Sequence, residues 1–118
     1  MSTDKEIEKE IQAKGLTAPR ITPADIEANI ASEYFFTADT PFEGDYPIGF
    51  SDMRILSNLT FCVLVLNNGF TVTGESACAS PENFDAEVGK KIARQNAANK
   101  IWPLMGYELR SKLANDAA

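Results

Sequence analysis

The spacing of apolar residues divides the chain into helical and extended segments. Near the N-terminus, Thr3-x-x-Glu6 is a capping-box pattern, and Ile7 and Ile11 follow four residues apart before Gly15. This pattern predicts a short helix with a thin apolar stripe. Two isoleucines bury little surface, so we expect this helix to be either frayed or docked on another element.

A second helix start lies at residues 22–25, where threonine, proline, alanine and aspartate give a cap, a first-turn proline and an acid near the positive end of the helix dipole. Ile26, Ile30 and Tyr34 then recur every four residues. The spacing predicts a helix of about three turns with one apolar side. Residues 1–36 are therefore predicted to form a helical N-terminal arm.

Residues 37–58 lack a clear period and contain two prolines and two glycines. A connection of this length without structure is unusual in a compact domain, so we interpret it as a functional or packing loop, with MRIL as a candidate extra strand. Its aromatic residues, Phe42, Tyr46 and Phe50, indicate that the loop packs against the rest of the protein.

A β-hairpin is predicted where TFCVLVLN and FTVTGES flank Asn68-Gly69, because an Asn-Gly turn between β-rich runs suits the positive φ angles that a two-residue turn requires. This turn pairs Val65 with Val72 and Val63 with Gly74. The first strand is apolar on both sides and should be the more interior. Two strands are not stable alone, so a helix or a partner subunit should cover one face. The residues of that face would be Phe61, Val63, Val65 and Val72.

The period changes to that of a helix after Cys78. Asp85 is a candidate cap, and an apolar stripe runs to Trp102. The residues of the stripe are Phe84, Val88, Ile92 and Ile101. A second row of small residues, Gly89, Ala93 and Ala97, predicts that another backbone approaches this helix closely. Pro103 should break or kink it, and LMGYELRSKL then forms a short last helix.

Together these elements predict a single α+β domain over residues 1–118. It has N-terminal helices and an antiparallel β-hairpin, with a third strand as an option, packed on a long C-terminal helix that is followed by a kinked short helix. The loop at 37–58 separates the N-terminal arm from a hairpin-plus-helix core at 59–113. The length of 118 residues suits one modest core.

Charge and hydropathy limit the partners. The formal net charge is -6, which argues against binding nucleic acid polymers or anionic membranes, since both depend on clustered lysine and arginine. The longest apolar run, Phe61 to Leu66, is too short to cross a bilayer. The N-terminus alternates charges where a signal peptide has an apolar core. We therefore expect a cytoplasmic protein.

Catalytic and metal chemistry has little support in the sequence. The chain contains no histidine, which excludes imidazole-based mechanisms, and its two cysteines cannot close a zinc site within one chain. The stretch SACASPENFD contains Cys78, but free cysteine most often behaves as a small buried hydrophobe. We interpret this stretch as the joint between strand and helix. No catalytic residue, cofactor or metal is predicted.

The basic residues cluster late in the chain. Residues 89–112 contain six bases and one acid, whereas residues 1–53 contain eleven acids and four bases. Arginine suits phosphate because its planar fork bonds two oxygens at once. One interpretation is a site for an anionic small molecule; the other is that the basic half docks on the acidic half of the same or a neighbouring chain. The candidate binding residues are Lys91, Arg94, Asn96, Asn99, Trp102 and Tyr107.

The segment NGFTVTGESACASPENFDAEVGKKIARQNAANKIWPLMGYELRSKL resembles a family of short tailed-phage proteins, found in N-four-like and Sf-six-like podophages and in prophages. The resemblance is close over about residues 60 to 113 and looser over TPADIEANIASEYFFTA. Asn-Gly, SAC, NFD and W-x-x-x-G-Y carry it. The resemblance supplies no catalytic residues.

What the resemblance implies is a context: a small accessory protein made in the cytoplasm of an infected bacterium. Accessory phage proteins commonly act by sequestration, so we expect a non-catalytic, homo-oligomeric protein that captures an anionic molecule such as a nucleotide immune signal. The alternative is an inhibitor or adaptor that contacts a host protein through the acidic N-terminal helices and the aromatic loop.

Overall fold

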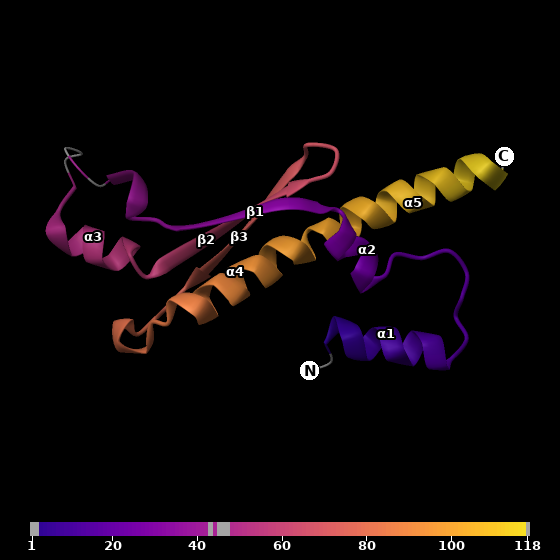
Figure 1. Ribbon diagram of the computed structural model, residues 1–118, viewed down its shortest axis with the longest axis horizontal. Helices are drawn as coiled ribbons and strands as arrows, with labels where there is room; N and C mark the ends of the chain where they lie inside the picture. Colours follow the sequence, from indigo (N-terminus) through magenta and orange to yellow (C-terminus); the bar gives the residue numbers. More distant parts are fainter. Residues whose placement is uncertain (1–2, 43, 45–47, 118) are drawn as a thin grey trace.

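The computed structural model describes residues 3–42, 44 and 48–117 and is elongated, with extents of 59 × 30 × 17 Å (Figure 1). In chain order, its elements are α1 (Asp4–Ala13), α2 (Pro23–Ala28), β1 (Ile30–Thr37), the 3-10 helix η1 (Thr40–Phe42), α3 (Phe50–Leu56), β2 (Leu59–Leu66), β3 (Thr71–Ala77), the 3-10 helix η2 (Pro81–Asn83), α4 (Ala86–Asn99) and α5 (Ile101–Ala117).

Both N-terminal helices begin at the predicted caps. The Thr3 hydroxyl accepts from the Glu6 backbone N–H, and the Glu6 carboxylate accepts from the Thr3 N–H, each at 3.1 Å. Thr22 and Asp25 form the same reciprocal pair at the start of α2. However, α2 ends at Ala28, so its predicted continuation is wrong.

The segment after α2 is a strand. Residues 30–37 form β1, an edge strand rich in aromatic and β-branched residues, which favour extended backbone. Ile30 and Tyr34 lie on opposite faces of the sheet, because a β-bulge between Ile30 and Ser32 shifts the register: Ile30 pairs with Leu66, whereas Tyr34 pairs with Val63. The sheet thus has a third strand, but at 30–37; the predicted placement at MRIL is wrong, because MRIL is the end of α3.

The hairpin is confirmed, but its register is wrong by one residue. Only Gly69 in the turn has a positive φ, 88°. The Leu66 N–H donates to the Phe70 carbonyl at 2.8 Å, which closes a three-residue loop instead of the predicted two-residue one. Val72 consequently pairs with Leu64. A shift of one residue exchanges the two faces of a strand.

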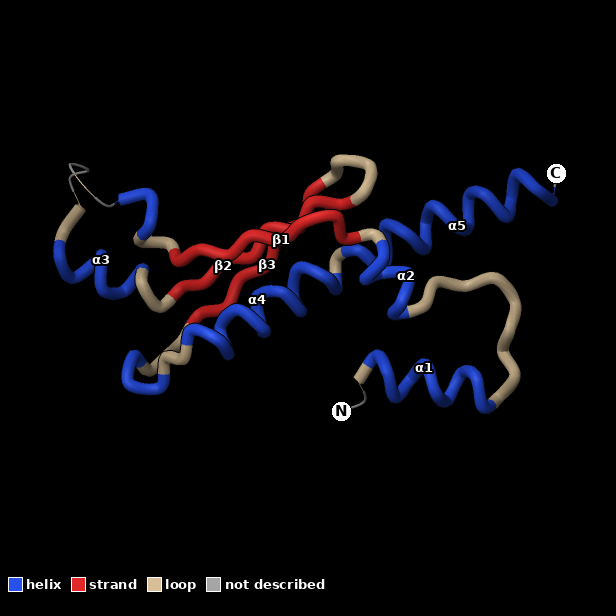
Figure 2. Tube along the Cα trace, in the orientation of Figure 1, coloured by secondary structure: helices blue, strands red, loops and turns tan. Residues whose placement is uncertain are grey.

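The helix-facing side of the sheet is therefore the even-numbered side of β2 and β3. Thr60, Cys62, Leu64 and Leu66 are buried there, whereas the predicted odd-numbered residues of β2 are half-buried on the other face. The strand order is β1-β2-β3, and both pairings are antiparallel. Figure 2 shows α4 running along this three-stranded sheet.

The predicted close approach to the small-residue row is confirmed at Gly74. A Cβ at this position would lie 2.3 Å from the Ala93 carbonyl oxygen and 2.3 Å from the Ala97 nitrogen, so only glycine fits. The predicted apolar stripe is wrong in its middle: Val88 and Ile92 are 50% and 45% exposed. The row of small residues, and not the stripe of larger ones, faces the sheet.

The C-terminal helix is bent, but not at the predicted residue. α4 ends at Asn99 with Lys100 as its cap, whose N–H donates to the Ala97 carbonyl at 3.1 Å. Pro103 lies in the first turn of α5, where its missing N–H breaks no helical hydrogen bond. With 17 residues, α5 is longer than the predicted short helix.

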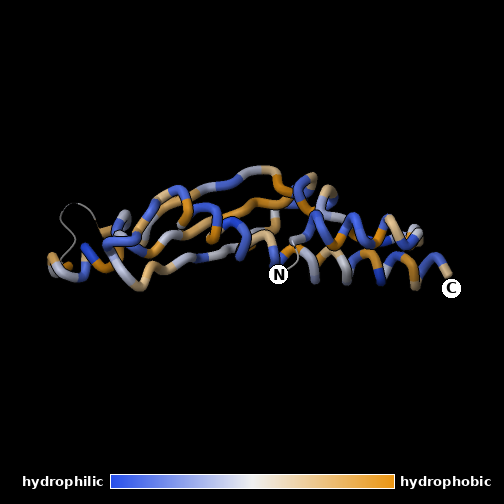
Figure 3. The backbone as a smooth tube through the Cα atoms, turned by 90° about the horizontal axis from the view of Figure 1, so that it is seen from below, coloured by the Kyte–Doolittle hydropathy of each residue, from blue (hydrophilic) through white to orange (hydrophobic). Residues whose placement is uncertain are grey.

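The core is thin for a chain of this length. Within the described ranges it contains nine buried hydrophobic residues, centred on Leu64 and Ile101, and three of them are alanines. The radius of gyration is 18.5 Å, against about 13 Å for a compact domain of this size. Apolar segments are spread along the whole molecule in Figure 3 instead of being gathered at one centre. The predicted α+β class and its helix-on-sheet arrangement are confirmed.

The predicted loop at 37–58 contains η1 and α3. Phe42 is half-buried, but Phe50 is 79% exposed, so the prediction that its aromatic side chains pack against the protein does not hold for Phe50. Tyr46 lies outside the described residues.

Candidate functional site

Arg94 joins three elements. From α4 it donates through Nη1 and Nη2 to the two carboxylate oxygens of Glu27 in α2, at 3.0 and 2.8 Å, and through Nε to Glu33 in β1, at 2.6 Å. The hydrogen bonds raise the pKa of Arg94, and the bond from Arg94 lowers the pKa of Glu27. Two carboxylates thus surround one guanidinium, and an added anion would meet net negative charge there.

Three other predicted binding residues lie apart from Arg94. The Asn96 side chain donates to the Glu75 carbonyl at 2.9 Å, on the β3 side of α4, because two residues correspond to about 200° around a helix. Lys91 is exposed on α4, and Tyr107 is 78% exposed on α5. The structure does not gather these three side chains into one pocket among the described residues.

Asn99 and Trp102 do meet Arg94 in a cleft beneath α1. This α1 cleft consists of two adjoining cavities of about 330 and 590 Å³ that share Asp4, Pro23, Asn99 and Trp102. The Asn99 side-chain Oδ1 accepts from the Gln95 Nε2–H at 2.7 Å. The remaining lining residues are Thr3, Lys5, Ile7, Glu8, Ile11, Ile21, Ile26, Glu27, Arg94, Gln95 and Ala98.

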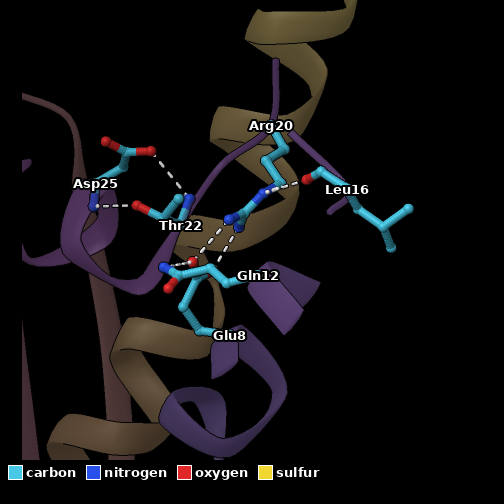
Figure 4. A network of polar contacts seen from close by, with 6 residues as sticks. All are labelled: Glu8, Gln12, Leu16, Arg20, Thr22 and Asp25. Carbon is cyan, nitrogen blue, oxygen red and sulfur yellow. Dashed lines mark hydrogen bonds and ion pairs between the residues drawn. The ribbon is translucent and has the colours of Figure 1, made fainter. Parts of the chain in front are cut away.

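The outer wall of the α1 cleft is held by an ion pair (Figure 4). Arg20 donates through Nη1 and Nη2 to the two oxygens of Glu8, with 2.7 Å for the second bond, and its Nε donates to the Leu16 carbonyl at 3.3 Å. These contacts lower the pKa of Glu8 and raise the pKa of Arg20. Both residues precede α2, so the pair closes the N-terminal segment on itself.

The α1 cleft has an acidic lining. Among the described residues that line it, the ionisable ones are three acids and two bases: Asp4, Glu8, Glu27, Lys5 and Arg94. Both Glu8 and Glu27 are paired with arginine. The cleft can accept an apolar or aromatic group against Trp102, but its charges oppose a phosphate.

A further cavity, of about 320 Å³, lies at the other end of α4. We call it the Phe84 cavity; it is lined by Phe35, Phe36, Thr37, Thr40, Thr60, Phe84, Ala86 and Lys90. Of the described residues that line it, only Lys90 is ionisable, and the Lys90 Nζ lies 5.9 Å from the centroid of the Phe35 ring. This is within the range of a cation–π interaction. The Phe84 cavity therefore combines aromatic walls, hydroxyls and a cation.

Thr60 has an unusual environment beside this cavity. It is 3% exposed, and its hydroxyl has no hydrogen-bond partner among the described residues. The hydroxyl lies 2.9 Å from where a Cβ on Gly89 would be, so it is pressed against α4. An unpaired buried hydroxyl costs about 1–3 kcal/mol.

Sequence reasoning misses the Phe84 cavity. The apolar spacing assigns Phe84 to the packing stripe and places Phe35 within a predicted helix, which sets the two rings far apart. Lys90 belongs to the basic cluster that the sequence does show. The missing information is the strand at 30–37, which brings Phe35 beside α4.

The cysteines have structural environments. Cys62 is completely buried, and burial raises the pKa of its thiol. The Cys78 thiol donates to the Ser80 carbonyl at 3.0 Å, directly after β3 and before η2. The stretch SACASPENFD does connect strand and helix, as interpreted. Across the described residues, no group of three potential metal ligands comes together.

Residues 21–113 match the model of the phage protein (N4 Gp49/phage Sf6 gene 66) family. The chain belongs to this family. The match begins after Arg20, so α1 and its ion pair lie outside the family region. No curated protein and no solved structure matches the chain. None of the described helices has the length and apolarity needed to cross a membrane.

Proposed function

We propose that this phage protein is a non-catalytic accessory protein that sequesters an anionic small molecule bearing a flat ring, such as a nucleotide immune signal, in the cytoplasm of the infected host. The observation that carries the proposal is the Phe84 cavity, whose described lining combines aromatic rings with the ammonium of Lys90 and has no carboxylate. A ring would lie against Phe35 or Phe84, and the Lys90 ammonium would pair with the anionic group.

The α1 cleft is the weaker site for such a ligand. It contains the predicted residues Arg94, Asn99 and Trp102, but the donors of Arg94 already bind Glu27 and Glu33. A phosphate would have to displace both carboxylates. A ring against Trp102 with the Asn99 amide at its edge is the form of ligand that this cleft favours.

Ligand capture is tested by incubating the purified protein with a panel of mononucleotides, cyclic mononucleotides and cyclic dinucleotides. The complex is isolated, heated to release the ligand and analysed by mass spectrometry. We expect release of the intact nucleotide. Release of a chemically altered nucleotide would indicate catalysis and contradict sequestration. Failure of every nucleotide to bind would also contradict the proposal.

The site is tested by Lys90→Met, with Lys91→Met as the matched control. The two lysines are neighbours on α4, but of the two only Lys90 lines the cavity. Loss of one charge-assisted hydrogen bond should weaken binding by roughly tenfold to a hundredfold in Lys90→Met and leave Lys91→Met near wild type. Trp102→Leu should have no effect; if it alone abolishes binding, the ligand belongs in the α1 cleft.

A second candidate is the inhibitor or adaptor role. It is favoured by α3, on which Phe50 and Ile55 are 79% and 65% exposed. Both should anchor a host protein if this role is correct. Replacing both with serine should abolish that interaction while nucleotide capture persists. Deleting the whole predicted arm at 1–36 is unsuitable, because it would remove most of β1.

A further inference from the structure

Within the part of the chain that the structure describes, one face of the sheet has no covering layer. There, β2 makes substantial contacts only with β1, β3 and α4, and α4 lies on the even-numbered side. We call the odd-numbered side the open face. From β1, β2 and β3, its three cross-strand rows are Phe36, Phe61 and Glu75; Tyr34, Val63 and Thr73; and Ser32, Val65 and Thr71.

The open face is apolar and almost without charge. Of the nine described residues in its three rows, only Glu75 could be charged at neutral pH, and the Phe36 and Phe61 rings stack with centroids 5.4 Å apart. Tyr34 is 60% exposed. Interface centres are depleted in charge and enriched in tyrosine and phenylalanine, as this face is. A partner selected by charge has little to recognise here.

The face is also graded in size. Its β1 edge carries Phe36 and Tyr34 with the smaller Ser32, its middle carries Phe61 and two valines, and its β3 edge carries Thr71, Thr73 and Glu75. A two-fold axis parallel to β2 exchanges the edges, so the aromatic edge of one copy would lie over the threonine edge of the other. At the central row Tyr34 then opposes Thr73 of the other copy, a large residue against a small one, and Phe36 opposes Glu75, at about the 10 Å separation of packed sheets.

The area of such a contact indicates its size class. From the strand spacing and rise, three strands of seven residues give a flat footprint of about 350 Å² per copy. Side-chain relief enlarges the accessible area, which places the total near the low end of specific interfaces, around 1,000 Å². The contact should therefore be reversible and concentration-dependent.

We infer that the open face is a homodimer interface, in which two copies stack sheet on sheet about a two-fold axis along β2. Strand β2 is apolar on both sides: its even-numbered side packs against α4, and its odd-numbered side would pack against a second copy of the chain. The row of Gly89, Ala93 and Ala97 has no part in it, because it is buried against the sheet of its own chain.

Sedimentation velocity over a range of concentrations tests the dimer, starting from a monomer mass of 12.9 kDa. We expect wild type to shift from monomer to dimer as concentration rises. Val63→Lys, at the centre of the open face, should raise the dissociation constant at least tenfold. Ile92→Lys makes a similar change on the exposed side of α4 and should leave it unchanged. Circular dichroism checks that both variants fold, and Thr73→Lys serves if Val63→Lys does not.

The axis is tested by charge rescue. Tyr34→Lys should weaken the dimer, and adding Thr73→Glu to it should restore affinity, because the two positions meet across the proposed axis but are separated by β2 within one chain. An axis perpendicular to the strands would set position 34 of one copy against position 34 of the other and give no rescue. A protein that is monomeric at all concentrations, or a dimer that Val63→Lys and Thr73→Lys leave intact, would overturn the inference.

Discussion

Two helices, α4 and α1, pack against the rest of the protein in very different ways. α4 lies so close to the sheet that Gly74 has no room for a Cβ, and the contact surface consists of small residues. At the other extreme, α1 has no buried residue and leaves the α1 cleft between itself and the α4–α5 junction. The contact between α4 and the sheet has no room for one added carbon atom, whereas the contact of α1 leaves cavities.

This difference agrees with the extent of the family. The match covers the sheet and α4 but begins after α1 and the Glu8–Arg20 pair. We therefore treat the α4–sheet contact as the structural basis of the family fold and the α1 segment as an addition to it. Variants at the two contacts should differ strongly in their effect on the free energy of unfolding.

Gly74→Ala should have the largest effect. Its Cβ would lie 2.3 Å from backbone atoms of both Ala93 and Ala97, and backbone cannot rotate away as a side chain does. We expect a loss of about 3 kcal/mol or more in the free energy of unfolding, measured by urea denaturation. Thr73→Ala, one residue away on the open face, is the control and should change it by less than about 1 kcal/mol. Equal effects would show that α4 does not pack this closely.

Thr60→Val should change stability in the opposite direction. Thr60 lies in the same contact, and its buried hydroxyl has no partner among the described residues. Valine has nearly the same shape without the unpaired group, so we expect a gain of about 1 kcal/mol in urea denaturation. Thr60→Ser keeps the hydroxyl and should not stabilise. A loss of stability in Thr60→Val would mean that the hydroxyl is in fact hydrogen-bonded.

Arg94→Met should have a smaller, pH-dependent effect. Glu27 and Glu33 are 58% and 43% exposed, so water screens the network, and we expect a loss of about 1 kcal/mol or less at neutral pH. Because pairing lowers the pKa of Glu27, its stabilisation is complete above the unfolded-state pKa of about 4.3 and disappears as pH falls through the lower folded value.

The measurement is therefore a comparison of Arg94→Met with wild type by thermal denaturation between neutral pH and about pH 3, which spans the carboxylate range. The difference in midpoint should be largest at neutral pH and close to zero at the acidic end. Lys91→Met, which removes an exposed charge three residues away, should show no such trend. A difference that is constant across pH would assign the effect to packing of the Arg94 side chain.

The sequence is informative where local chemistry decides the structure. Thr3 and Thr22 specify helix starts, and the row of Gly89, Ala93 and Ala97 indicates a close contact, because each pattern lies within a few turns of one helix. The strand at 30–37 escapes prediction because Ile26, Ile30 and Tyr34 follow a helical spacing, and the sequence does not signal the bulge that puts Ile30 and Tyr34 on opposite faces of the strand. The hairpin register fails for a related reason: Asn68-Gly69 permits two turn lengths, and one extra loop residue exchanges the faces.

The candidate site is less predictable, since it depends on contacts between distant segments. The sequence correctly shows Arg94 as part of a basic cluster, but its neutralisation by Glu27 and Glu33 requires α2 and β1 to lie beside α4. That placement supports the alternative in which basic and acidic halves dock within one chain. The Phe84 cavity depends on the same missed strand.

Deleting residues 1–20 should have the smallest effect on stability and is the sharpest test of the loose contact. The deletion removes both Glu8 and Arg20, so neither residue is left behind as an unpaired charge. We expect a change of less than about 0.5 kcal/mol in the free energy of unfolding.

Trp102, the only tryptophan in the sequence, lines the α1 cleft and should report the deletion directly, with fluorescence at longer wavelength and stronger quenching by acrylamide. Full-length protein with Ile7 and Ile11 replaced by serine should reproduce the fluorescence change, because both isoleucines line the α1 cleft together with Trp102. A loss of more than about 1 kcal/mol on deletion would instead make α1 part of the cooperative core, and the contrast between the two contacts would then be one of geometry alone.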